Sequence, residues 1–238
     1  MKILGLPLAS VLLFSALIAQ SGALPALAIS APSPPRNLTA LAVSDTKVFL
    51  IWDPPVNATG VIGYLIEYKT GSNPYSILIS NTGNVTTYLN SGLVANASYT
   101  YRVFAFNSVV EGNPSNEVTV TTLSVPSAPR DLSASAVSSS QINLIWTAPT
   151  NDGGTPIIGY NILRDSCTGS GVLIFTTTNS STKYSDMGLT ANTCYRYNVE
   201  AINAIGNGNA SIHNATATTK PAPLNTHAPN APTGLDVK

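Results

Sequence analysis

Apolar and polar side chains alternate along several short segments of this chain, most clearly in residues 99–107. Successive side chains of a β-strand point to opposite faces of a sheet, so alternate residues share a face. The pattern predicts an inward face made of Tyr99, Tyr101, Val103 and Ala105. Residues 195–203 alternate in the same way and place Tyr195, Tyr197, Val199 and Ala201 inward. Both segments are therefore expected to be strands with one buried face.

Further strands are predicted by runs of β-branched and aromatic residues bounded by Gly and Pro. Residues 47–52 and 141–146 each end in Trp, and residues 61–68 and 157–164 follow Pro-containing loops. Roughly seven strands in about 95 residues, with turn signals every 8–12 residues, are typical of an antiparallel sandwich. We predict an all-β fold of tandem seven-stranded antiparallel β-sandwiches, without a core helix.

The chain contains an internal repeat. Trp52 and Trp146 are 94 residues apart, whereas Tyr99 and Tyr195 are 96 apart, and the change of two falls in a predicted surface loop. A third copy begins near the C-terminus, where APNAPTGLDVK resembles VPSAPRDLSAS. The expected regions are an N-terminal signal segment at 1–28, domains at 31–123 and 126–220, and a Pro-rich linker with the truncated start of a third repeat at 221–238.

Both copies carry the same motifs in the same order. The first has FLIWDPP, VIGYLIEY and GLVANASYTYRVFAFN, and the second has NLIWTAP, PIIGYNI and GLTANTCYRYNVEAIN. These motifs resemble the fibronectin type III domain family over residues 31–220, with a fragment at 228–238. The resemblance implies an immunoglobulin-like sandwich whose signature core residues are Trp52, Tyr99, Trp146 and Tyr195. The two tyrosines would form tyrosine corners, in which the hydroxyl bonds to a nearby turn backbone.

Residues 2–28 are typical of a secretory signal. Lys2 precedes an almost wholly apolar stretch, and Ala26-Leu27-Ala28 is a small-x-small cleavage pattern. The apolar core of about 16 residues is short for a membrane span, which needs about 20. We expect cleavage after Ala28, and an uncleaved N-terminal anchor is the alternative. Either outcome predicts a secreted or cell-surface protein.

Charge and composition exclude some classes of partner. The chain has 11 Lys and Arg against 11 Asp and Glu, and only 9% of its residues are charged. A nucleic-acid binder or a binder of anionic membranes needs a basic patch, so neither partner is expected. His213 and His227 lack metal-ligand spacing, and no nucleophile or phosphate-loop motif occurs. We therefore expect no metal, no cofactor and no enzymatic activity.

The two cysteines are a candidate disulfide. Cys167 follows the third strand of the second unit, and Cys194 opens the sixth. In the fold that the resemblance implies, those two strands pair antiparallel, which brings the Cα atoms within about 5–6 Å of each other. Disulfides persist in exported proteins. The alternative is a pair of free thiols.

Seven Asn-x-Ser/Thr triplets are candidate glycan acceptors for an exported chain. Chance predicts nearly five in this composition, so turn and strand-edge asparagines are an equally weighted interpretation. The seven are Asn37, Asn57, Asn84, Asn96, Asn179, Asn209 and Asn214.

The outward face of the first unit is unusually apolar. Alternation sends Leu65, Phe104 and Phe106 outward on two neighbouring strands, which predicts an exposed partner surface. The alternative is that a neighbouring strand, a loop or the other unit covers these side chains. A Phe104 side chain that is at least a quarter exposed would keep the idea, whereas a Phe104 side chain buried inside the sandwich would end it.

Together these patterns favour a non-catalytic spacer and binding protein of adhesion type, secreted or on a cell surface. The four residues that join the predicted domains, and the prolines of residues 221–232, indicate stiff joints. The alternative is an accessory region of an exported polysaccharide-degrading enzyme. The expected partner is an unidentified extracellular protein or carbohydrate.

Overall fold

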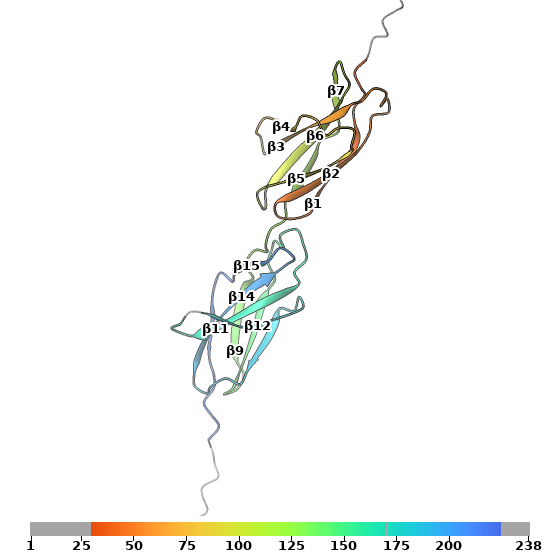
Figure 1. Cartoon of the computed structure of the whole chain (residues 1–238). Helices are drawn as coiled ribbons and strands as arrows, with labels where there is room; N and C mark the ends of the chain where they lie inside the picture. The colour runs from red at the N-terminus through yellow and green to blue at the C-terminus, as the bar shows by residue number, and fades with distance from the viewer. Residues whose placement is uncertain (1–29, 170, 225–238) are drawn as a thin grey trace, which may run out of the picture.

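The computed structural model describes residues 30–169 and 171–224, and these residues form two β-sandwiches that lie end to end (Figure 1). The predicted signal segment, the start of the third repeat and His227 lie outside the described residues. No helix occurs in the described ranges, and none there could cross a membrane. The predicted all-β class is confirmed.

Each domain contains eight strand segments. In the first domain they are β1 (Arg36–Ala42), β2 (Lys47–Asp53), β3 (Gly63–Thr70), β4 (Ser76–Ile79), β5 (Thr87–Ser91), β6 (Ser98–Phe106), β7 (Glu111–Pro114) and β8 (Val118–Thr121). In the second domain they are β9 (Arg130–Ala136), β10 (Gln141–Thr147), β11 (Gly159–Ser166), β12 (Val172–Thr176), β13 (Lys183–Met187), β14 (Cys194–Ile202), β15 (Asn207–Ala210) and β16 (Ala215–Thr218).

The eight segments make seven strands, because the last two belong to one strand. In the first domain one sheet has the order β1-β2-β5 and the other has the order β4-β3-β6-β7, with β8 also paired to β6. β7 and β8 lie on the same edge of β6, and the chain leaves the ladder between Pro114 and Val118. The second domain repeats this topology, with β15 and β16 on the edge of β14.

The core of each sandwich is built by the residues that alternation placed inward. Tyr101, Val103 and Ala105 are fully buried on β6, as are Tyr197, Val199 and Ala201 on β14. Each core also holds a Trp with its ring edge against a Tyr from the opposite sheet. The ring centroids of Trp52 and Tyr64 are 5.4 Å apart, and those of Trp146 and Tyr160 are 5.1 Å apart. Such edge-to-face contacts add to the burial of the rings.

Candidate functional site

The two signature tyrosines bond to the turn that precedes their own strand. The Tyr99 hydroxyl accepts a hydrogen bond of 3.0 Å from the Val94 amide, and the Tyr195 hydroxyl accepts one of 3.0 Å from the Thr190 amide. The geometry is that of the tyrosine corner. These residues therefore have a structural role, like Trp52 and Trp146 in the cores.

A second buried tyrosine in each domain has a different partner. In the first domain the Asn90 amide donates a hydrogen bond of 2.9 Å to the Tyr101 hydroxyl. In the second domain the Tyr197 hydroxyl donates one of 2.8 Å to the carboxylate of Asp186. Burial raises the pKa of Tyr101 to about 12. Burial, and then the hydrogen bond to Asp186, raise the pKa of Tyr197 further.

Asp186 has a charged partner that its counterpart Asn90 lacks. The Arg164 guanidinium lies 2.9 Å from a carboxylate oxygen of Asp186, and the Asp186 side chain is only 5% exposed. The position of Arg164 is occupied in the first domain by Tyr68, whose ring stands 6.4 Å from that of Tyr101. A buried ion pair in one domain thus corresponds to a neutral amide and a ring in the other.

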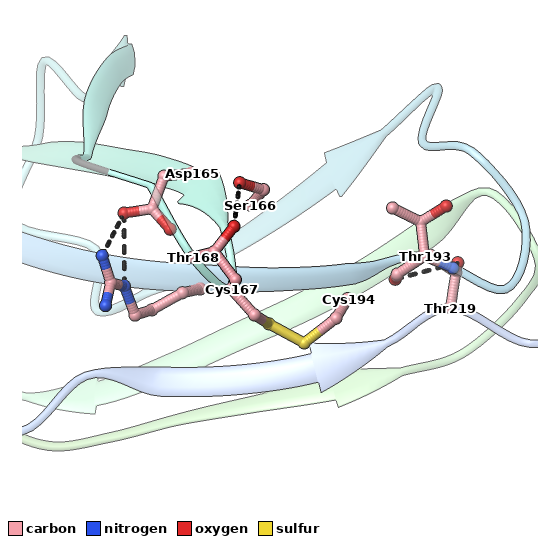
Figure 2. The surroundings of a disulfide bond; sticks show 8 residues. Asp165, Ser166, Cys167, Thr168, Thr193, Cys194 and Thr219 are labelled. Atoms are coloured by element: carbon pink, nitrogen blue, oxygen red, sulfur yellow. Dashed lines mark hydrogen bonds and ion pairs between the residues drawn. A yellow bond between two sulfur atoms is a disulfide. The ribbon is translucent and has the colours of Figure 1, made fainter.

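Cys167 and Cys194 form a disulfide at the open end of the β11–β14 ladder (Figure 2). Their Cα atoms are 5.7 Å apart, because Ser166 faces Tyr195 in the register and the two cysteines are the next residues outward. Nearby, Arg196 pairs with Asp165 at 2.8 Å. The first domain has Gly71 and Ser98 at the positions of the cysteines, so the bridge is restricted to the second domain.

The expectation of an exposed aromatic surface is wrong for Phe104, which is only 8% exposed. The alternation was read correctly, because Phe104 lies outside the buried core cluster and its strand neighbours Val103 and Ala105 point inward. Its outward position is covered instead. Pro114 of β7 lies opposite it in the register, and the Arg102 guanidinium stands 5.1 Å from the ring centroid.

Arg102 holds this covering layer together. Its guanidinium lies 3.8 Å from the centroid of the Tyr75 ring and 2.7 Å from a carboxylate oxygen of Glu67. A cation above an aromatic face is attracted by the ring quadrupole, most strongly where water is excluded. Burial also raises the pKa of Tyr75 to about 12. The outer face of the first domain is therefore a second, small layer of packed side chains.

Leu65 and Phe106, the other two residues of the predicted surface, are half-buried and line one shallow hollow of about 310 Å³. Val109 and Val110, in the turn after β6, complete its apolar lining and are exposed. Sequence reasoning missed these valines because they lie outside the alternating segments. The hollow is the part of the predicted surface that the structure retains as a candidate contact site.

The seven predicted acceptor asparagines are all exposed. Two of them, Asn37 and Asn96, have a left-handed backbone, and the Asn37 side chain donates a hydrogen bond of 2.7 Å to Asp53. Exposure is compatible with glycosylation and equally with a turn role.

Two consecutive residues, Leu123 and Ser124, form the joint between the domains. On the side of the first domain, the Leu123 amide donates to the Ser44 carbonyl at 3.2 Å. The next residue, Ser124, is bonded to the second domain: its amide donates to the Gly153 carbonyl at 2.9 Å, and its carbonyl accepts from the Asn203 side chain at 2.8 Å. Consecutive residues are therefore bonded to different domains.

Gly153 is required at this joint. Its φ is +78°, a region that L side chains rarely adopt, and a Cβ atom there would overlap the Ser124 carbonyl. Asn107 holds the chain that enters the first domain in the way that Asn203 holds the joint, because its side chain donates to the Ser30 carbonyl at 2.8 Å. The entry contact thus belongs to both repeats.

Within residues 30–169 and 171–224, no group of three or more His, Cys, Asp and Glu side chains could hold a metal ion. The charged side chains that are buried or half-buried in this part of the chain include the pairs formed by Arg102, Arg164 and Arg196.

Comparison with known proteins gives a consistent assignment. The Fibronectin type III domain family matches residues 33–121 and 127–216. The chain is 33% identical to Chitinase A1 of Niallia circulans over 84% of its own length and 28% of the chitinase. It is 30% identical to the Netrin receptor DCC of Mus musculus, over 88% of its own length and 15% of the receptor.

A solved structure gives a weaker similarity. The crystal structure of chicken CNTN1 FN1-FN3 domains matches 81% of this chain and 68% of its own, with 22% identity and a TM-score of 0.43. The chain spans less than a third of the length of the two curated relatives.

Proposed function

Because this chain belongs to the fibronectin type III family, we propose that it is an exported, non-catalytic spacer that holds its surfaces at a fixed separation and presents them to an extracellular protein or carbohydrate. The observation that carries the proposal is the joint at Leu123 and Ser124, where neighbouring residues are bonded to different domains. A joint whose neighbouring residues are bonded to different domains limits rotation of one domain against the other. The end-to-end arrangement then behaves as a rod (Figure 1).

The relatives support an extracellular setting. Modules of this family occur in a chitinase and in a netrin receptor, and both belong to much longer chains. A disulfide in the second domain is stable where the surroundings are oxidising. The family hosts many functions, so the fold alone does not choose the partner.

The spacer role is tested by NMR residual dipolar couplings of the 31–238 chain. A rigid rod gives both domains one alignment tensor. Gly153→Ala should give the domains separate tensors, because the added methyl overlaps Ser124. Gly60→Ala is the matched control, because Gly60 has the same φ of +78° but no atom near the added methyl. Separate tensors in the unmodified chain would contradict the proposal.

A second candidate is an accessory region of an exported polysaccharide-degrading enzyme, which the 33% identity to a chitinase favours. We expect such a region to be retained on insoluble chitin or cellulose. Co-sedimentation of the 31–238 chain with each polymer measures this. Retention on neither polymer would favour a protein partner.

A further inference from the structure

The first strands of the two domains begin with the same backbone deviation. Asn37 in β1 and Asp131 in β9 both have φ of +52°, and in both ladders the register shifts at this point. The shift leaves the next residue, Leu38 or Leu132, without a partner on the neighbouring strand. In an extended strand, the N–H and C=O of one residue point to the same side. Each domain therefore presents one adjacent donor and acceptor at this edge.

The first domain satisfies this pair with a side chain. The Leu38 amide donates to the Asn116 side-chain oxygen at 3.0 Å, and the Asn116 side-chain nitrogen donates to the Leu38 carbonyl at 3.0 Å. A primary carboxamide has its oxygen and one N–H on the same edge, so it can bond to both groups at once. Asn116 lies between β7 and β8, where the chain leaves the ladder.

The second domain has Ile212 at the position of Asn116. The surrounding backbone is the same in both domains. The Ser115 amide donates a hydrogen bond to the Val103 carbonyl, and the Ser211 amide donates one to the Val199 carbonyl, both at 2.8 Å. Isoleucine cannot donate or accept, and its side chain is 71% exposed. Across residues 30–169 and 171–224, no side chain bonds to the N–H or C=O of Leu132, and neither group has a backbone bond outside the strand ladders.

A hollow of about 190 Å³ lies at this edge of the second domain. Its walls are formed on one side by the segment 129–132 and on the other by Ser211, Ile212 and His213. The hollow has room for the end of one side chain. Arg130, Asp131 and His213 are exposed at its rim and offer further polar contacts.

We propose that this hollow is a binding site for the side-chain carboxamide of a Gln or Asn residue of another polypeptide. The ligand group would accept a hydrogen bond from the Leu132 N–H and donate one to the Leu132 C=O, as Asn116 does with Leu38 in the first domain. A carboxylate lacks the donor. A trans secondary amide, such as an acetamido group on a sugar, has its donor and acceptor on opposite edges. The site adds to the spacer role and does not depend on it.

The test uses N-acetyl-glutamine N-methylamide, whose only primary carboxamide is in the side chain, and follows the backbone amide NMR signals of the 31–238 chain. We expect a saturable shift of the Leu132 signal and none of the Leu38 signal. The glutamate analogue and N-acetylglucosamine should bind at least tenfold more weakly. An equal response to all three probes, or no response of Leu132, would overturn the proposal.

Reciprocal variants complete the test. Ile212→Asn should supply the carboxamide internally and abolish the response of Leu132 to the probe, whereas Ile212→Val should keep it. Asn116→Ile should free the N–H and C=O of Leu38 in the first domain, so that the Leu38 amide signal begins to shift with the probe. Unchanged indole signals of Trp52 and Trp146 show that the variants fold. An undiminished response in Ile212→Asn would place the probe elsewhere and refute the site.

Discussion

The two domains share one fold but stabilise corresponding positions by different chemistry. On β6, the Tyr101 hydroxyl is hydrogen-bonded to the neutral side-chain amide of Asn90. On β14, the Tyr197 hydroxyl is hydrogen-bonded to the carboxylate of Asp186, which is paired with Arg164. The replacements are coupled: a carboxylate at Asp186 without Arg164 would be a buried, uncompensated charge. The difference shows that the fold requires a partner for this hydroxyl but leaves open whether the partner is charged.

The outer faces differ in the same way. In the first domain, Phe104 and Arg102 form a packed layer over the sheet. In the second domain the position of Phe104 is Glu200, which accepts a hydrogen bond of 3.3 Å from Asn161. The second domain adds a covalent bridge at the end of this sheet. Four experiments should separate the two ways of stabilising these positions. In the first three, the indole NMR signals of Trp52 and Trp146 report the unfolding of each domain separately.

The largest effect is expected from the disulfide. The bridge closes a loop with a sequence separation of 27, and the chain-entropy relation gives about 3.5 kcal/mol of stabilisation. Replacing both Cys167 and Cys194 by Ser should lower the free energy of unfolding of the second domain by that order. Urea unfolding measured on the Trp146 signal tests this. An equal loss of unfolding free energy in the first domain, read from the Trp52 signal, would contradict the assignment of the effect to the second domain.

Asp186→Ala should have the next largest effect on the free energy of unfolding. It leaves Arg164 without its counter-ion and Tyr197 without its acceptor. Removing one partner of a buried pair costs about 3–5 kcal/mol, and we expect about 2–3 here because Arg164 is partly exposed. Asn90→Ala is the control and should cost the first domain about 1 kcal/mol, the value of a neutral hydrogen bond. Equal losses of unfolding free energy in Asp186→Ala and Asn90→Ala, measured by urea unfolding, would mean that the charge of Asp186 adds no stability.

Phe104→Ser should destabilise the first domain by about 2 kcal/mol, because it removes a buried ring that packs under Arg102. Glu200→Ser at the corresponding position should cost the second domain only about 1 kcal/mol, because it removes the hydrogen bond from Asn161 but no buried ring. The free energies of unfolding of the two variants measure the difference. A folded, fully stable Phe104→Ser variant would contradict the stabilising role of the packed layer formed by Phe104 and Arg102.

A fourth effect is expected at alkaline pH. The pKa of Tyr101 is raised to about 12 in the folded chain and that of Tyr197 is raised further, whereas an unfolded tyrosine titrates near 10. Above pH 10 the unfolded chain therefore binds fewer protons than the folded chain, and stability falls as pH rises through the folded pKa. Below pH 10 this contribution is fully present.

The slope of the free energy of unfolding against pH is measured by urea unfolding at pH 9 to 12, followed by the carbon NMR signals of the Tyr rings. Tyr197→Phe should reduce this slope in the second domain, and Tyr101→Phe should reduce it in the first, where Tyr75 keeps part of it because its pKa is also raised to about 12. An unchanged slope in both variants would assign the alkaline loss to other groups.

Much of the fold follows from local patterns. Alternation in residues 99–107 and 195–203 placed the inward residues correctly, because a two-residue period needs no knowledge of the rest of the chain. The predicted proximity of Cys167 and Cys194 rested on the strand pairing of the resembled fold, and the structure joins them in a disulfide. Exposure of Phe104 was predicted wrongly, because the period defines a face but not which neighbouring side chains cover it.

The sequence by itself determined the repeated unit, the strands and the inward residues, since each depends on spacing along one segment. Only the tertiary structure decided how segments far apart in the chain meet. Asn116 reaches Leu38 across 78 residues, and Asn203 reaches Ser124 across 79. Such contacts depend on how loops between sheets are placed, which no local period encodes. The hollow beside Leu132 and the joint at Ser124 both arise from contacts of this kind.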